Sequence, residues 1–179
     1  PNWLKPAAGG VAIGFIGLFL PQIFGVGYET IEQILAGENL GVLLLIALIL
    51  GKLILTPVSI GSGFMGGVFA PSLFLGAMLG AAYGAVAGNL IPSMALSTAA
   101  FAMVGMAAVL AGAVHAPLTA IILLFEMTND YRIILPLMFA VIVSMLISQI
   151  LQRDSVYTLG LTRKGIRLNR GRDIEILQA

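Results

Sequence analysis

A glycine-rich segment that runs directly into a long apolar stretch contains the residues whose types and spacing could do chemistry. Residues 61–71 read GSGFMGGVFAP. Pro71 is typical of the first turn of a helix, where its missing N–H would have no partner within the helix anyway. A helix that begins at residues 67–71 leaves its first N–H groups, near Val68 and Phe69, without helical partners. The segment therefore predicts free backbone donors at a helix N-terminus.

Two kinds of partner could satisfy these donors. A helix N-terminus carries about half a positive charge and its N–H groups point outward, so an anion is one partner. Gly66 and Gly67 have no side chain to block its approach. Neighbouring carbonyl groups or water are the other partner, because an unpaired N–H in an apolar environment costs several kcal/mol. The residues alone leave both open.

The composition places this segment in a membrane protein. Of the 179 residues, 59% are hydrophobic and 9% are charged, whereas soluble domains carry about 25% charged residues. No charged residue lies between Lys52 and Glu126, and so long a stretch belongs in lipid or in the interior of a membrane bundle. The 22 glycines favour close helix packing. The net charge of +1 gives no sign of a nucleic-acid partner, and we expect no metal and no cofactor.

The apolar segments predict an all-α, polytopic transmembrane bundle with short, broken and tilted helices and without strands. A helix needs about 20 residues to cross the hydrocarbon, and only some segments are that long. Thr56-Pro57 is expected to end the second of them, because proline lacks an N–H and clashes with the preceding turn. Two explanations of such interruptions stay open. They are typical of broken helices that hold a small solute near the bilayer midplane of a transporter. They are also found as kinks in ordinary spanning helices. The segments are 7–24, 40–60, 68–91, 99–114, 117–127 and 133–151, and a more polar stretch, 28–39, is expected to be a short interfacial helix.

Other polar side chains in these segments each have a structural and a functional explanation. Lys52 lies in an apolar segment, where a charge marks a functional site by default, although lysine can also extend to the interface. His115, close before Pro117, is expected to be a capping or loop residue. An intramembrane hydrolase would need a nucleophile and a base, and Ser62 with His115 is the one candidate pair. The usual intramembrane serine-protease pattern has a glycine two positions before the serine. The glycine before Ser62 is adjacent to it, so this pattern is not met. Ser59 and Ser62 either line an approach to the helix start or satisfy the loop backbone.

The basic residues are distributed unevenly and predict the orientation of the chain. Six of the nine lie after position 152, so by the positive-inside bias the tail is cytoplasmic and the protein is a multi-pass protein of the plasma (inner) membrane. We expect residues 1–152 to form the membrane part, 153–172 the last helix and a basic tail, and 173–179 the start of a linker. The six are Arg153, Arg163, Lys164, Arg167, Arg170 and Arg172.

Several motifs, in order, resemble the CLC family of chloride channels and chloride/proton exchangers. Residues 66–71 (GGVFAP) resemble the GxFxP signature of that family. Residues 115–122 (HAPLTAII) with 126–131 (EMTNDY) resemble the next landmark, and 134–136 (ILP) follow as expected. Val156-Tyr157 then precede a basic helix, as in the last membrane helix of the family. The resemblance covers essentially the whole chain.

The resemblance implies that the chain is the second half of a CLC protomer, without the first helix of that half. In the family, the helix at GxFxP gives backbone amides to a central chloride, and the tyrosine of the last helix gives its hydroxyl. Carried over, these donors are the amides of Val68 and Phe69 and the hydroxyl of Tyr157, and Lys52 would shape the field for anions. Gly66, Gly67 and Pro71 would form the loop around the site.

The resemblance also implies chloride as the transported ion and a homodimer in the intact protein. The tail resembles the stretch that leads to paired cytoplasmic CBS domains. The glutamates that distinguish exchangers in the family are not in this sequence, so channel and exchanger both stay open. The helices at 117–127 and 133–147 are expected to form the dimer contact, with lipid as the alternative neighbour. The contact residues would be Leu118, Ile121, Ile122, Ile134, Leu137 and Met138.

Overall fold

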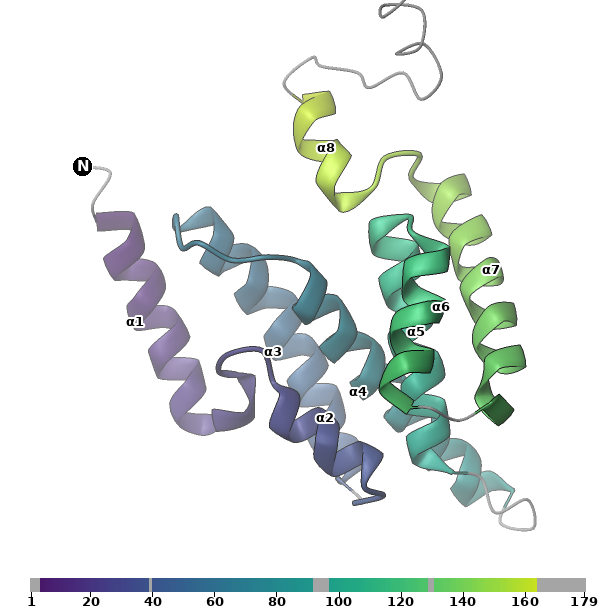
Figure 1. Cartoon of the computed structure of the whole chain (residues 1–179). Coiled ribbons are helices and arrows are strands. Elements are labelled where there is room, and N and C mark those ends of the chain that lie inside the picture. The colour runs from purple at the N-terminus through teal and green to yellow at the C-terminus, as the bar shows by residue number, and fades with distance from the viewer. Residues whose placement is uncertain (1–3, 39, 92–96, 129–130, 164–179) are drawn as a thin grey trace, which may run out of the picture.

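The computed structural model describes residues 4–38, 40–91, 97–128 and 131–163 (Figure 1). Every regular element in these ranges is a helix, which confirms the predicted all-α class. In chain order the elements are α1 (Leu4–Phe19), the 3-10 helix η1 (Pro21–Ile23), α2 (Tyr28–Leu35), α3 (Val42–Gly61), α4 (Phe69–Leu90), α5 (Thr98–Val114), α6 (Pro117–Thr128), the 3-10 helix η3 (Tyr131–Ile133), α7 (Ile134–Leu151) and α8 (Val156–Arg163).

The six apolar segments each hold a helix, and the helices differ in length as expected. Three helical stretches in the described residues are long and apolar enough to cross a membrane, namely Val42–Gly61, Phe69–Leu90 and Tyr131–Thr162. Three others are apolar but shorter, namely Lys5–Phe19, Thr98–Val114 and Pro117–Thr128. The α4 helix begins at Phe69, inside the predicted window, while α5 ends at Val114, with its predicted segment, and α6 ends at Thr128, one residue past its segment. The fold is therefore a mixture of spanning and short helices.

The expectation that Thr56-Pro57 ends the second apolar helix is wrong. The α3 helix continues through Pro57 to Gly61. A proline so near a helix C-terminus removes only its own N–H bond, and membrane helices tolerate this loss. Gly63 ends the helix instead: its φ is +95°, its N–H donates to Ile60 O at 3.1 Å, and the next N–H reaches back to Ser59 O at 3.2 Å. This pattern is a Schellman motif, which needs a residue that adopts positive φ easily.

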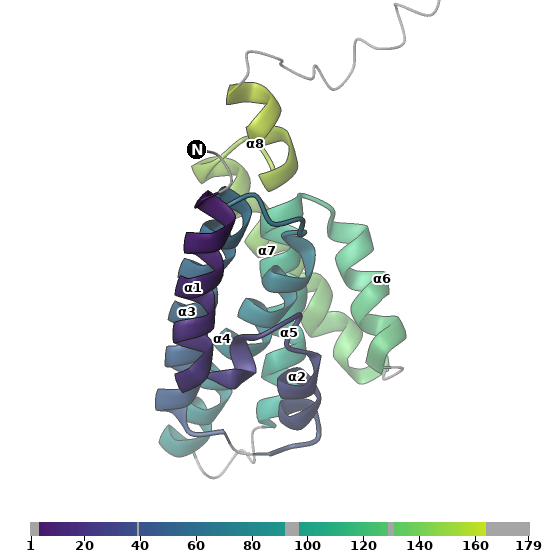
Figure 2. The same ribbon diagram turned by 90° about the vertical axis from the view of Figure 1, so that its left-hand side faces the viewer.

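The helices pack in a row with α4 and α5 at its centre (Figures 1 and 2). The α3 helix packs on α4 and α1 on α3, while α6 and α7 pack on the other side of α5. At the centre the α4 and α5 backbones meet almost without side chains between them. A Cβ atom added to Gly80 would lie 2.1 Å from Phe101 O, and one added to Gly105 would lie 2.3 Å from Gly76 O. Glycine is required here because the two backbones approach so closely.

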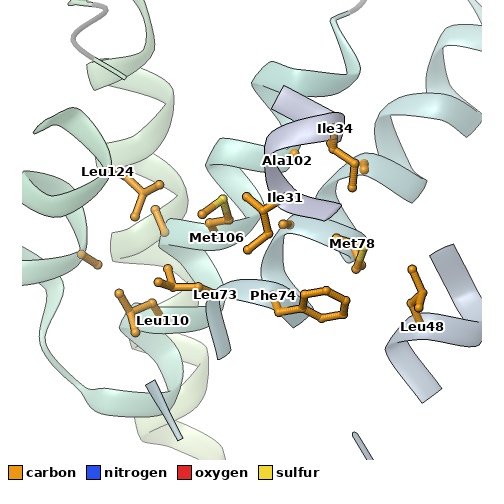
Figure 3. Close-up of a cluster of buried hydrophobic side chains, with 14 of the residues drawn as sticks. Ile31, Ile34, Leu48, Leu73, Phe74, Met78, Ala102, Met106, Leu110 and Leu124 are labelled. Carbon is orange, nitrogen blue, oxygen red and sulfur yellow. The ribbon is translucent and has the colours of Figure 1, made fainter. Parts of the chain in front are cut away.

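A buried apolar cluster surrounds this central pair (Figure 3). Its largest fully buried side chain is Phe74 of α4. The predicted polar stretch at 28–39 contains α2, whose residues Thr30, Ile31 and Ile34 are buried against the bundle. The α2 helix thus has an apolar face in the core and an acidic face outside; its position at a membrane interface stays a prediction. The labelled core residues are Ile31, Ile34, Leu48, Leu73, Phe74, Met78, Ala102, Met106, Leu110 and Leu124.

Candidate functional site

A cavity of about 530 Å³ lies at the start of α4. Its walls come from α1, from the turn after η1, from α3, and from the glycine-rich loop with the first turn of α4. The segment that the sequence singled out therefore lines a cavity, together with Lys52. The lining residues are Ile13, Ile23, Phe24, Gly25, Val26, Lys52, Leu55, Thr56, Ser59, Ile60, Met65, Gly66, Gly67, Phe69, Ala70 and Pro71.

The first turn of α4 leaves backbone donors free. Val68 is the N-cap residue, and no side chain caps the helix there. The first intrahelical bond runs from the Ser72 N–H to Val68 O at 3.1 Å, and the Ser72 hydroxyl donates to the same oxygen at 2.7 Å. Pro71 removes one of the donors that a helix start leaves unpaired. Within the described residues, the N–H groups of Val68 and Phe69 have no hydrogen-bond acceptor.

Lys52 is almost completely enclosed, with 5% of its surface exposed. Its Nζ donates to Ile23 O at 2.9 Å and to Gly25 O at 2.8 Å, and it lies 4.9 Å from the centre of the Phe74 ring. No carboxylate in the described residues forms an ion pair with it. The ammonium is thus a buried positive charge held by carbonyl dipoles and an aromatic face, and it does not extend to the surface.

Tyr157 lies elsewhere. It is the second residue of α8, half of its surface is exposed, and it does not line the cavity at the start of α4. Its hydroxyl has no hydrogen bond to a described residue. The α8 helix lies at the same end of the bundle as the glycine-rich loop (Figures 1 and 2). The structure thus gathers Lys52, Gly66, Gly67, Phe69 and Pro71, and the convergence of Tyr157 with the amides of Val68 and Phe69 stays a prediction.

Two features of the lining were not recognised from the sequence: the polar stripe on α3 that adds Thr56 to Lys52 and Ser59, and the turn at 23–26. Lys52, Thr56 and Ser59 follow one another at helical spacings of four and three, so they share one face of α3. All three line the cavity, and this polar stripe in an apolar helix was a signal available in the sequence. The turn at 23–26 carries no such signal, because only the tertiary fold brings it beside α4.

His115 is a capping residue, as expected. It follows the last turn of α5 in the left-handed conformation with φ 59°, and its N–H donates to Ala111 O at 2.9 Å. The Ser148 hydroxyl donates to Gly112 O at 2.6 Å, so its oxygen accepts from His115 Nε2, 3.1 Å away. His115 therefore ties α5 to α7. It is bonded to Ser148 and not to Ser62, so the pair required for a hydrolase is not formed.

The residues expected at the dimer contact differ in exposure. Leu118 and Ile122 of α6 are 73% and 60% exposed, and Met138 of α7 is 41% exposed. Ile121 and Ile134 are half-buried. Leu137 is completely buried and belongs to the hydrophobic core of the chain. An apolar face that includes Leu118, Ile122 and Met138 is available to a neighbour, and Leu137 is not part of it.

Comparison with known proteins gives the family. Residues 1–149 match the family model described as voltage gated chloride channel. The chain is 41% identical over 150 residues to an H(+)/Cl(-) exchange transporter ClcA of Vibrio campbellii, an alignment that covers 84% of this chain and 32% of that protein. It is 36% identical over 157 residues to a voltage-gated ClC-type chloride channel ClcB of Escherichia coli O81, covering 88% and 37% of the two chains.

A solved structure agrees. The crystal structure of a slow cyanobacterial Cl-/H+ antiporter superposes with a TM-score of 0.67 at 34% identity, over 75% of this chain and 31% of the other. The chain belongs to the voltage-gated chloride channel family, as the motif resemblance implied. It spans about a third of the length of the curated relatives it matches.

Proposed function

We propose that this chain is part of a protein that carries chloride across a membrane, as a channel or as a chloride/proton exchanger. The observation that supports this most directly is the start of α4: free N–H groups at a helix N-terminus, beside a cavity, in a bundle of apolar helices. Such donors suit an anion. Family membership makes chloride the natural anion, since matched relatives are named for chloride exchange and chloride conduction.

The proposed ligands are the amides of Val68 and Phe69 and the hydroxyl of Tyr157, with Gly66, Gly67 and Pro71 shaping the loop. Dehydrating a bare ion in a medium of low dielectric constant costs on the order of tens of kcal/mol. Several neutral donors offset part of this cost and still let the ion leave, whereas a full positive charge in contact with it would hold it tightly. Lys52, which is held at the cavity by carbonyl groups, is proposed to act on the anion site without being a ligand.

The intact protein is proposed to be a homodimer in the plasma (inner) membrane, with the basic tail in the cytoplasm. Leu118, Ile122 and Met138 would form part of the subunit contact, and lipid is the alternative occupant of that face. The proposed boundary near residue 152 falls between α7 and α8. Residues 164–179, which include most of the basic tail and the proposed linker toward CBS domains, lie outside the described residues. The alternative to chloride transport is transport of another small solute.

A comparison of two tyrosines in the intact protein tests the anion site. Tyr157→Phe removes only the hydroxyl, and loss of a hydrogen bond to a charged group should weaken chloride binding about tenfold or more. Tyr83→Phe is the matched control, because Tyr83 is also exposed but lies far along α4 from its first turn. Chloride affinity would be measured by calorimetry and chloride efflux from liposomes. Equal affinities in the two variants would refute the Tyr157 assignment, and efflux of another solute without chloride would favour the alternative.

A further inference from the structure

One wall of the cavity at the start of α4 is a short connection without a long helix of its own. Residues 21–27, called here the η1 linker, join α1 to α2 and include η1. Four of them, Ile23, Phe24, Gly25 and Val26, line the cavity. The first turn of α4 and the glycine-rich loop also line it. A shift of the linker would therefore change the width of the cavity.

The linker packs on its neighbours at several points: the Ile23 side chain lies against Gly51 of α3, the Phe24 ring lies against Gly17 of α1, and two further contacts involve Phe74. Lys52 Nζ binds the carbonyl oxygens of Ile23 and Gly25 and lies 4.9 Å from the centre of the Phe74 ring. At Gly27, where φ is +81°, an added Cβ would lie 2.3 Å from a carbon of the same ring. Phe74 is itself completely buried in α4. The linker is thus fastened to α3 through the ammonium and rests on α4 through Phe74.

Two of the three donors of Lys52 are already used by the protein. An ammonium has three N–H groups. Two of them serve the carbonyls, and the ring lies within the distance of about 6 Å at which a cation interacts with an aromatic face. The group is 95% enclosed, since 5% of its surface is exposed. The ammonium is therefore bound mainly to the linker and the ring, and only a small part of the side chain is open to the cavity.

We infer that Lys52 is a positioning residue: its ammonium fastens the η1 linker to α3 and α4 and so sets the width of the cavity at the start of α4. Lys52 affects anion binding by holding the linker in place, and this part of the inference rests on the function proposed above. Each hydrogen bond from a charged donor changes the equilibrium between a docked and a released linker by a factor of about ten or more. Removing the ammonium should therefore loosen the linker around residues 23–25.

Cysteine accessibility tests the tether directly. The chain has no cysteine, so Ile23→Cys gives it a single thiol at a linker position of which 5% is exposed, in the intact protein with any cysteine outside this chain replaced. Lys52→Met, which keeps the stem but removes the donors, should raise the rate at which a charged thiol reagent modifies this cysteine about tenfold or more. Lys52→Arg should restore a rate near that of wild type. A cysteine at Tyr83, exposed on α4, should react at the same rate in all backgrounds. Equal rates at position 23 in the wild-type and Lys52→Met backgrounds would overturn the inference.

Chloride binding by the intact protein distinguishes the effect of the linker's position from a direct effect of the Lys52 charge. Gly27→Ala keeps the charge of Lys52 but pushes the linker away from Phe74, so it should weaken chloride binding in the same direction as Lys52→Met. Gly37→Ala is the matched control, because its φ is +86° but an added Cβ meets nothing within 4 Å.

The double variant Lys52→Met with Gly27→Ala should be little weaker than either single one, since both act on the linker. Wild-type affinity in Gly27→Ala with a loss in Lys52→Met would show that the charge acts directly, and would overturn the inference. A released linker with unchanged chloride affinity would support the tether and count against the proposed anion site.

Discussion

Replacing Gly80 by alanine tests whether the contact between the α4 and α5 backbones holds the bundle together. The added Cβ would lie 2.1 Å from Phe101 O, whereas ordinary contact is 3.4–4 Å. The shortfall is therefore 3.4 minus 2.1, or 1.3 Å, at the least. The atom it meets belongs to the backbone and cannot rotate away. The two helices must separate by about that distance near the substituted turn.

The cost of this separation follows from two opposing terms. Alanine is favoured over glycine inside a helix by roughly 0.5–1 kcal/mol. Overpacking of a tight interior costs about 1–3 kcal/mol or more, and a gap of 0.5–1 Å forfeits about a quarter to a half of each dispersion contact along the seam. We expect Gly80→Ala to lower the free energy of unfolding by about 1–3 kcal/mol.

Gly88→Ala is the matched control because it lies in the same helix and its Cβ would meet nothing within 4 Å. Gly88→Ala should gain the higher helix propensity of alanine without a clash, so its free energy of unfolding should equal or exceed that of the wild type. Both variants would be unfolded in mixed micelles with increasing denaturing detergent, and helix content followed by circular dichroism. If Gly80→Ala were as stable as Gly88→Ala, the close backbone contact would not be a source of stability.

Three further predictions concern transport, assembly and the seam between α5 and α7. The 179-residue chain alone should not release chloride from liposomes above the empty control, because in an inverted repeat the ion path lies between two halves; clear efflux would show that one half suffices. A cysteine at Ile122 should form cross-linked dimers of the intact protein, while one at the buried Leu137 should not, and the reverse pattern would place the contact elsewhere. Ser148→Ala should lower the free energy of unfolding by about 1–3 kcal/mol, because it leaves buried groups on α5 unpaired. Ser144→Ala breaks only the hydrogen bond to Ala108 O, so it should lower the free energy of unfolding by less. Equal decreases in the two variants would contradict a stabilising hydrogen bond between Ser148 and His115.

The local signals in the sequence predicted most of the helices, and the failures have physical causes. The start of α4 was predictable because glycine and proline act within one turn of their own positions. The end of α3 was not predictable, because a proline so close to a helix end has only a weak effect. The chain turns at Gly63, two residues past the end of α3 at Gly61. The sequence left open whether Lys52 is buried or extends to the interface, and its partners could not be predicted, since carbonyl acceptors have no sequence signature. Tyr157 was assigned by resemblance alone, and the described residues do not test it.

The contact between α4 and α5 also determines how the helices can move. Side chains at most helix contacts can change rotamer and allow one helix to slide or tilt against another. At Gly76, Gly80 and Gly105 the surfaces are main chain, which has no such freedom. The two helices therefore form one mechanical body, and any displacement of the free amides at the start of α4 has to be transmitted to α5. From α5 it reaches α7 through the serine hydrogen bonds.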